Sequence, residues 1–175
     1  MGDVFNEQIV KRQPKAKDAL LRVALIIGVL VLVIAAFVIA PAFAPVISLV
    51  IGFVAFYLNG FLKVEYEYAY TNGELDIDII YNRSRRKRVF SGNVKQIEIM
   101  AHVDDMMHAG SFSGAQEVLD YSSGVPGADT YAFMIAVGGK QTKIIIEPNE
   151  KLQNTLRSSM SRTKLHLKKP EYGGL

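Results

Sequence analysis

The sequence contains one segment whose residue types suit the binding of an anion. Between residues 83 and 88 it reads Arg-Ser-Arg-Arg-Lys-Arg, so that Arg83, Arg85, Arg86, Lys87 and Arg88 crowd one short stretch. Near a membrane surface each such cation contributes about 1 kcal/mol toward anionic lipid, over a screening length of ~10 Å. The segment is therefore interpreted as a contact for lipid headgroups or for an acidic protein partner. The alternative is a solvated hairpin tip that only sets membrane topology.

A second segment has side chains that bind metals elsewhere. It runs from His102 to His108 as His-Val-Asp-Asp-Met-Met-His, and histidine and aspartate are both suitable ligands. The spacing matches no established ligand motif, so no metal site is predicted. A metal-dependent hydrolase that uses His102 and Asp104 is kept as the last alternative.

No other pattern indicates catalysis. The chain has no cysteine, which excludes disulfides and a cysteine nucleophile, and neither a G-x-S-x-G turn nor a phosphate-binding loop is present. We predict no catalytic residue, no cofactor and no enzyme. Nucleic-acid binding is not expected either, because the basic segment lacks flanking aromatic residues for stacking and the rest of the region around it is not basic.

An uncharged run separates these segments from the N-terminus. Residues 23–62 contain no Asp, Glu, Lys, Arg or His, which is about twice the ~20 residues that one helical span needs. Pro41 and Pro45 favour a break in the middle. We predict two transmembrane helices, over about 20–40 and 46–62. A single kinked helix would reach ~60 Å, too long for one bilayer.

A cleaved signal peptide is the other reading of the apolar run. Ala42-Phe43-Ala44 resembles a cleavage site, but Pro45 would follow the cut directly and a second apolar segment comes after it.

The flanks of the run predict its orientation. Basic residues precede the first helix, from Lys11 to Arg22, and Lys63 and the basic segment follow the second. Because Lys and Arg are retained in the cytoplasm, both termini are expected there, in a multi-pass protein of the cell membrane.

The pattern changes to period two after Lys63. Val64–Thr71 and Leu75–Tyr81 alternate around Asn72-Gly73, a strong signal for a hairpin with a type I′ turn. Further strands are predicted at residues 86–90, 95–101, 117–121, 130–137 and 141–147. Asn149 then suits the N-cap of a helix whose apolar stripe is Leu152, Leu156 and Met160. The tyrosines at 66, 68, 70 and 81 are expected in the core or at the membrane interface, not in a ligand pocket.

This order of elements resembles the bacterial pleckstrin-homology-like (PH-like) membrane proteins. The resemblance rests on the hairpin Val64–Tyr81 directly after the second apolar helix, and on Ile144-Ile-Ile-Glu-Pro148 running into the last helix. It implies a membrane α-hairpin plus a mainly-β domain, a seven-stranded β-sandwich capped by a C-terminal helix. One departure is that the first hairpin loop, residues 71–74, has no basic residue, so inositol-phosphate recognition at the usual site is not expected.

The predicted organisation is a basic cytoplasmic tail over residues 1–19, a helical hairpin over 20–62, a PH-like domain over 63–161 and a basic tail over 162–175. The leading hypothesis is a non-enzymatic, membrane-anchored module that binds a protein partner or orients at the lipid surface. The rival hypothesis is an accessory subunit that joins a larger membrane complex through its helical hairpin, where small residues permit close contacts.

Overall fold

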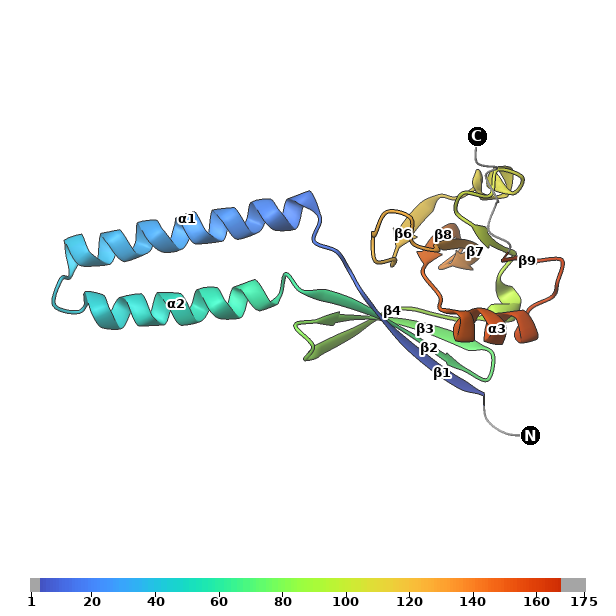
Figure 1. Cartoon of the computed structure of the whole chain (residues 1–175), viewed down its shortest axis with the longest axis horizontal. Helices are drawn as coiled ribbons and strands as arrows, with labels where there is room; N and C mark the ends of the chain where they lie inside the picture. The colour runs from blue at the N-terminus through green and yellow to red at the C-terminus, as the bar shows by residue number, and fades with distance from the viewer. Residues whose placement is uncertain (1–3, 168–175) are drawn as a thin grey trace. The chain divides into compact units, whose positions relative to one another are not determined.

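The computed structural model describes residues 4–167, which fall into two compact units. The helical unit consists of residues 13–64 together with 80–85. The β unit consists of the described residues up to Arg12, of Glu65–Ile79, and of those from Arg86 onward. Figure 1 shows the elements of both units along the chain.

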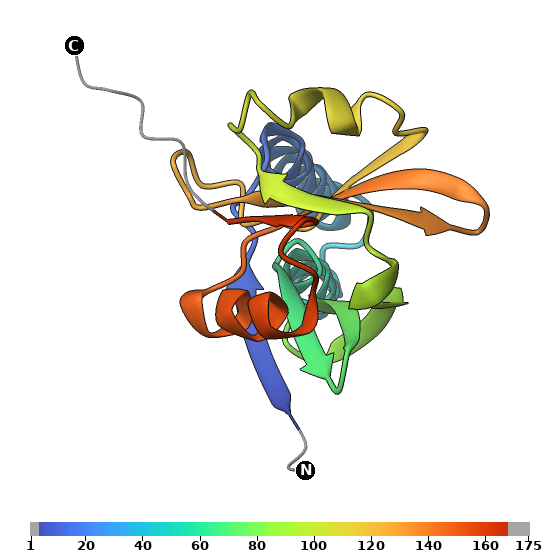
Figure 2. The same cartoon turned by 90° about the vertical axis from the view of Figure 1, so that its right-hand side faces the viewer.

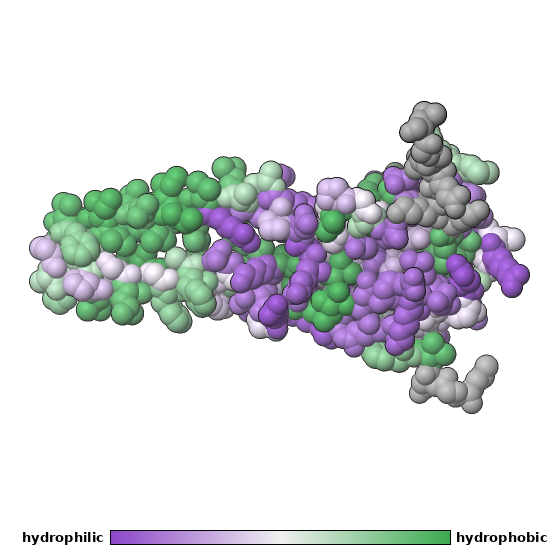
Figure 3. All heavy atoms as spheres, in the orientation of Figure 1, coloured by the Kyte–Doolittle hydropathy of each residue, from purple (hydrophilic) through white to green (hydrophobic). Residues whose placement is uncertain are grey.

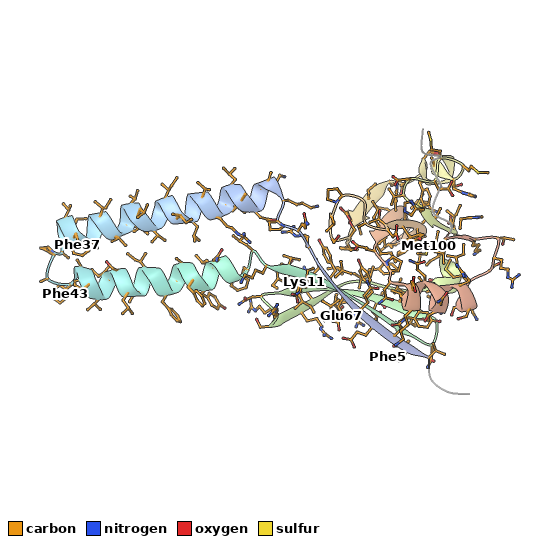
Figure 4. All side chains as sticks on the ribbon, viewed as in Figure 1. Phe5, Lys11, Phe37, Phe43, Glu67 and Met100 are labelled. Carbon is orange, nitrogen blue, oxygen red and sulfur yellow. The ribbon has the colours of Figure 1, made fainter. Side chains whose placement is uncertain are left out.

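The helical unit is an antiparallel pair, α1 (Ala16–Ile39) and α2 (Ala44–Gly60). At the start of α1 the Asp18 carboxylate accepts a hydrogen bond from the Lys15 N–H at 2.8 Å. Pro45 lies in the first turn of α2, where no backbone donor is required. α1 ends at Ile39 and α2 begins at Ala44, so the predicted break near the two prolines is confirmed. Phe37 and Phe43 lie close to this connecting turn (Figure 4). By length and composition α1 suits a membrane span, whereas α2 is apolar but shorter, with 17 residues.

The first sheet has the order β1-β2-β3-β4. Its strands are β1 (Phe5–Lys11), β2 (Val64–Thr71), β3 (Glu74–Tyr81) and β4 (Arg85–Asn93). Asn72 and Gly73 both have positive φ, 49° and 99°, which confirms the predicted hairpin. β1 pairs antiparallel with β2, and Lys11 lies opposite Glu65.

The second sheet has the order β6-β8-β7-β5-β9. Its strands are β5 (Ile99–His102), β6 (Glu117–Asp120), β7 (Tyr131–Val137), β8 (Lys140–Ile146) and β9 (Leu165–His166). The β7–β8 hairpin turns at Gly138 and Gly139, both with positive φ, as predicted. Two short 3₁₀ helices, Val94–Gln96 and Ala109–Phe112, connect strands.

Aromatic side chains join the two sheets in the core. The Tyr66 and Tyr121 rings meet edge to face at 5.5 Å, and the Phe90 and Phe133 rings lie 5.6 Å apart. Tyr68 is fully buried, and its hydroxyl donates to the Tyr121 carbonyl. Tyrosines 66, 68 and 70 are thus core residues, as predicted. Met100 of β5 is also fully buried.

The last helix, α3 (Glu150–Ser159), begins at the predicted N-cap: the Asn149 side chain accepts a hydrogen bond from the Leu152 N–H at 2.8 Å. Leu152 and Leu156 are fully buried. Figure 2 shows α3 beside β1, and Gln8 of β1 connects the two. Its amide donates to the Glu147 carbonyl and accepts from the Asn149 N–H, both at 2.8 Å.

Two strands differ from the sequence prediction, which gave seven where residues 4–167 contain nine. β1 lies in the segment that was predicted to be a tail. The sequence did not reveal this strand because its inward side chains include the polar residues Asn6 and Gln8. These amide side chains hydrogen-bond to α3 and the segment before it, so no apolar alternation marks the strand. β9 has only two residues and lies in the predicted C-terminal tail, whose residues 168–175 are outside the described part of the chain. In β3 the buried residue is Ile80 where Ile79 was expected.

The link between Gln8 and α3 can be tested by mutation. Gln8→Ala removes both hydrogen bonds that join β1 to the start of α3, so we expect the free energy of unfolding to fall by about 1–2 kcal/mol. A lower Tm of the full chain in mild detergent measures this. Lys11→Ala, on the exposed side of the same strand, is the control, and equal Tm values for the two variants would contradict the prediction.

Candidate functional site

The five basic residues predicted from the sequence all lie on the β3–β4 hairpin. Arg83 is in the turn, with a left-handed φ of 55°, and the other four begin β4. All five are exposed. Arg86 and Arg88 hold acidic partners across the sheet, whereas Arg85 and Lys87 have no ion pair among residues 4–167.

Two of the basic side chains, Arg86 and Arg88, form ion pairs with neighbouring strands. Arg86 Nη2 lies 2.7 Å from a carboxylate oxygen of Glu67 on β2. Arg88 reaches β3, with Nη1 2.9 Å from Asp76 and Nε 3.0 Å from Asp78. The hydrogen bond to Asp78 and the charge of Asp76 raise the pKa of the Arg88 guanidinium. These two cations are therefore committed to the sheet and are weak candidates for an external anion.

Glu67 is the most perturbed acid of this network. It is only 2% exposed, and Figure 4 shows it on β2 beside β1. Burial and, after it, a hydrogen bond with the Glu7 carboxyl raise its pKa from 4.5 to about 7, against the opposing charge of Arg86. Near neutral pH the Glu67 carboxyl is therefore partly protonated, since burial disfavours its charged form.

The tip of the β3–β4 hairpin is fixed against the end of α2 within the helical unit. The Asn82 N–H donates to the Lys63 carbonyl at 3.0 Å. A Cβ on Gly60, the last residue of α2, would lie 2.7 Å from the Asn82 side chain, so only glycine permits this approach. Arg83 therefore sits beside the point where the chain leaves α2.

The histidine segment is organised by its own side chains. The His102 ring is buried, accepts the Asp104 N–H and meets the Tyr131 ring edge to face at 5.2 Å. His108 instead lies 2.7 Å from the Asp105 carboxylate, which lowers the Asp105 pKa. Its ring stacks on His166 of β9. Within residues 4–167 no group of three or more His, Asp or Glu side chains is placed to hold a metal ion.

Sequence reasoning missed the acidic half of the network. The alternation in β3 placed Asp76 and Asp78 on the face away from the core, but nothing in the pattern paired them with β4. The role of Glu7 depends on β1, a strand that the sequence did not reveal.

A family model described as a bacterial PH-like domain (DUF6106) matches residues 2–165. The match includes both apolar helices and the strands from β1 to β8, and it ends at the first residue of β9. Comparison with curated proteins and with solved structures found no match.

The raised pKa of Glu67 predicts a pH-dependent stability. Between pH 4.5 and about 7 the folded state binds the Glu67 proton more tightly than the unfolded state, so this group's stabilisation falls as the pH rises through that window. Glu67→Gln removes the titration. We expect the free energy of unfolding of the variant, relative to that of the wild type, to rise by about 2–3 kcal/mol between pH 4.5 and pH 8. Denaturation curves of the full chain in detergent measure this difference.

A second variant checks the cause. Glu7→Gln removes the adjacent carboxylate and should move the Glu67 midpoint to lower pH, as followed by NMR of the carboxyl carbon. If the free energies of unfolding of the wild type and Glu67→Gln changed in parallel with pH, the assignment of the raised pKa to Glu67 would be contradicted.

Proposed function

The chain belongs to this family of bacterial PH-like domains, and we propose that it is a non-enzymatic module anchored in the cell membrane by the α1–α2 hairpin. In this proposal the β unit lies in the cytoplasm, and the tip of the β3–β4 hairpin contacts anionic lipid headgroups. The contact orients the β unit for a protein partner.

One observation carries the proposal of two membrane crossings: both helices are inserted between two neighbouring strands. β1 ends at Lys11 and β2 pairs with it from Glu65, directly opposite, so the chain must return to the place that it left. If α1 crosses a bilayer, α2 has to cross back. Its 17 residues span about 25 Å at 1.5 Å per residue, a mismatch that a ~30 Å hydrocarbon core accommodates by local thinning.

The exposure of the helices supports burial in lipid. Apolar side chains cover them on all sides, and Val38, Ile39 and Phe56 are 76%, 81% and 79% exposed. On the face that Figure 3 draws, most of the surface of the two helices is hydrophobic. An apolar surface of this extent is rare on a protein in water and is typical of membrane contact.

The charges around the helix ends support the orientation. Lys17 and Arg22 lie in the first turns of α1, Lys63 follows α2, and Arg83 stands beside it. Basic residues thus gather at the end of the helical unit where the chain enters and leaves, which the positive-inside rule assigns to the cytoplasm. The connecting turn at residues 41–43 carries no charge.

A second candidate function, an accessory subunit that assembles through its helices, is favoured by one observation. A Cβ placed on Gly28 or Gly52 would meet nothing within 4 Å, so neither glycine serves the contact between α1 and α2. Both leave room for a helix of another membrane protein.

The topology can be tested with single cysteines, since the chain has none of its own. We expect Ala42→Cys, in the turn between the helices, to react with a membrane-impermeant maleimide added to intact cells. Ser84→Cys, in the hairpin tip, should react only after lysis, because the membrane separates the two positions.

Phe53→Cys in the middle of α2 serves as the control and should resist labelling until detergent is added. Labelling of Ser84→Cys from outside, or of both positions from one side, would contradict two crossings.

The lipid contact of the hairpin tip gives a separate prediction. Arg85 and Lys87 are exposed and have no ion pair among residues 4–167, so they are free to meet headgroups. With an environment-sensitive dye on Ser84→Cys in nanodiscs, we expect a blue shift when anionic lipid replaces phosphatidylcholine. The shift should disappear at about 1 M salt, where the screening length is ~3 Å.

Arg85→Gln/Lys87→Gln should abolish the blue shift. Lys140→Gln/Lys151→Gln removes the same charge from other parts of the β unit and should retain it. Equal loss in both variants would show general attraction of the domain, and no shift in the wild type would leave the basic tip as a topology signal.

A further inference from the structure

A groove opens between the two helices at the end where the chain enters α1 and leaves α2. It has a volume of about 430 Å³. Its lining combines apolar side chains with three polar ones, and consists of Arg22, Leu25, Ile26, Ala55, Phe56, Asn59 and Lys63. Two cations and an amide thus face a common space whose walls are otherwise hydrocarbon.

Among residues 4–167, no side-chain partner is found for the polar side chains of this groove. The Arg22 Nε is buried without a hydrogen-bond acceptor. Across residues 4–167, neither the Asn59 amide nor the Lys63 ammonium has a side-chain hydrogen bond or ion pair. Asp18, the one acid of α1, is engaged by the Lys15 N–H. Donors in an apolar setting are costly to leave unsatisfied, so the groove is complementary to an anion with several acceptor oxygens.

A second groove continues the first along the helices. It is lined only by apolar residues, Leu25, Gly28, Val29, Leu32, Val50, Ile51, Val54, Ala55 and Leu58, and has a volume of about 290 Å³. Leu25 and Ala55 belong to both grooves. Gly28 contributes no side chain to fill it. Together the two grooves are complementary to an anionic amphiphile: the cationic end suits its headgroup and the apolar groove suits its hydrocarbon chain.

We propose that the two grooves hold one anionic phospholipid of the cytoplasmic leaflet, with its phosphate between Arg22 and Lys63 and an acyl chain along the apolar groove. Arginine donates in a fork that matches phosphate oxygens, and lysine adds a point charge. Basic pockets between membrane helices on the cytoplasmic side are suited to such headgroups. This inference rests on the membrane anchorage proposed above and assigns its lipid a defined site.

The position of Lys63 connects the lipid to the β3–β4 hairpin. Its carbonyl accepts the hydrogen bond from Asn82, so the residue whose ammonium would hold the headgroup is also the residue whose carbonyl fixes the hairpin tip. The bound lipid would therefore stiffen the junction between α2 and the hairpin.

The test is native mass spectrometry of the full chain in mild detergent with added dioleoylphosphatidylglycerol or dioleoylphosphatidylcholine. We expect one phosphatidylglycerol to be retained in preference to phosphatidylcholine. At about 1 kcal/mol for each cation, Arg22→Gln/Lys63→Gln should weaken that binding about 30-fold.

The matched control, Lys11→Gln/Lys17→Gln, removes the same charge from residues that precede or begin α1 but do not line the groove, and should keep the bound lipid. Equal losses in both double variants, or no preference for phosphatidylglycerol in the wild type, would overturn the site. Retention of glycerol 3-phosphate as strong as that of the lipid would show a free-phosphate site and also overturn it.

Extraction of cell membranes at alkaline pH separates this proposal from the one on which it depends. A wild-type chain that is released from the membrane would contradict the anchorage itself. A chain that stays in the membrane while the lipid preference is absent would contradict only the groove.

Discussion

The pairing of Lys11 with Glu65 is the constraint on which the rest of the molecule depends, because both long helices lie in the chain between these two residues. An antiparallel neighbour pair holds its strands about 5 Å apart, and this fixes the entry and the exit of the helices at one place. A hairpin of two helices satisfies that condition and a single long helix does not. The β unit is consequently discontinuous in sequence, and a fragment that starts at Val64 would lack the edge strand that Gln8 attaches to α3.

Because the chain enters and leaves the helices at one place, the flanking charges are also brought together. Cations that flank the helices are collected at one end of the helical unit, where Asn82 also attaches the hairpin tip to Lys63. Further along β4 the alternation of the strand turns Arg86 and Arg88 toward Glu67, Asp76 and Asp78. A run that looks uniform in sequence thus contains two kinds of residue: Arg86 and Arg88 form ion pairs that hold the sheet, and Arg83 lies beside the end of α2. Ion pairs with a buried acid such as Glu67 resist screening more than exposed pairs do.

Much of this architecture was predictable because its signals are local. The turn at Asn72-Gly73, the N-cap at Asn149 and the break near Pro41 each depend on the conformational limits of one or two residues. β1 was not predictable, because its inward positions hold Asn6 and Gln8, and what makes them suitable is a helix nearly 150 residues away. For the same reason the sequence did not predict the raised pKa of Glu67 or the ion pairs of Arg86 and Arg88, because both depend on the register of the strands in the folded sheet.

The geometry of the first sheet also accounts for the absence of basic residues in the first hairpin loop. Consecutive antiparallel strands turn at opposite ends, so Asn72-Gly73 lies one full strand from Lys63, while Asn82-Arg83 returns to it. Eight residues of β2 extend about 26 Å, well beyond a screening length of ~10 Å. Under the proposed anchorage, a cation in the first loop would gain little from the membrane, whereas Arg83 in the second loop lies beside Lys63 at the end of α2. A domain anchored in this way would favour headgroup contacts at the second loop, where the basic segment of residues 83–88 begins.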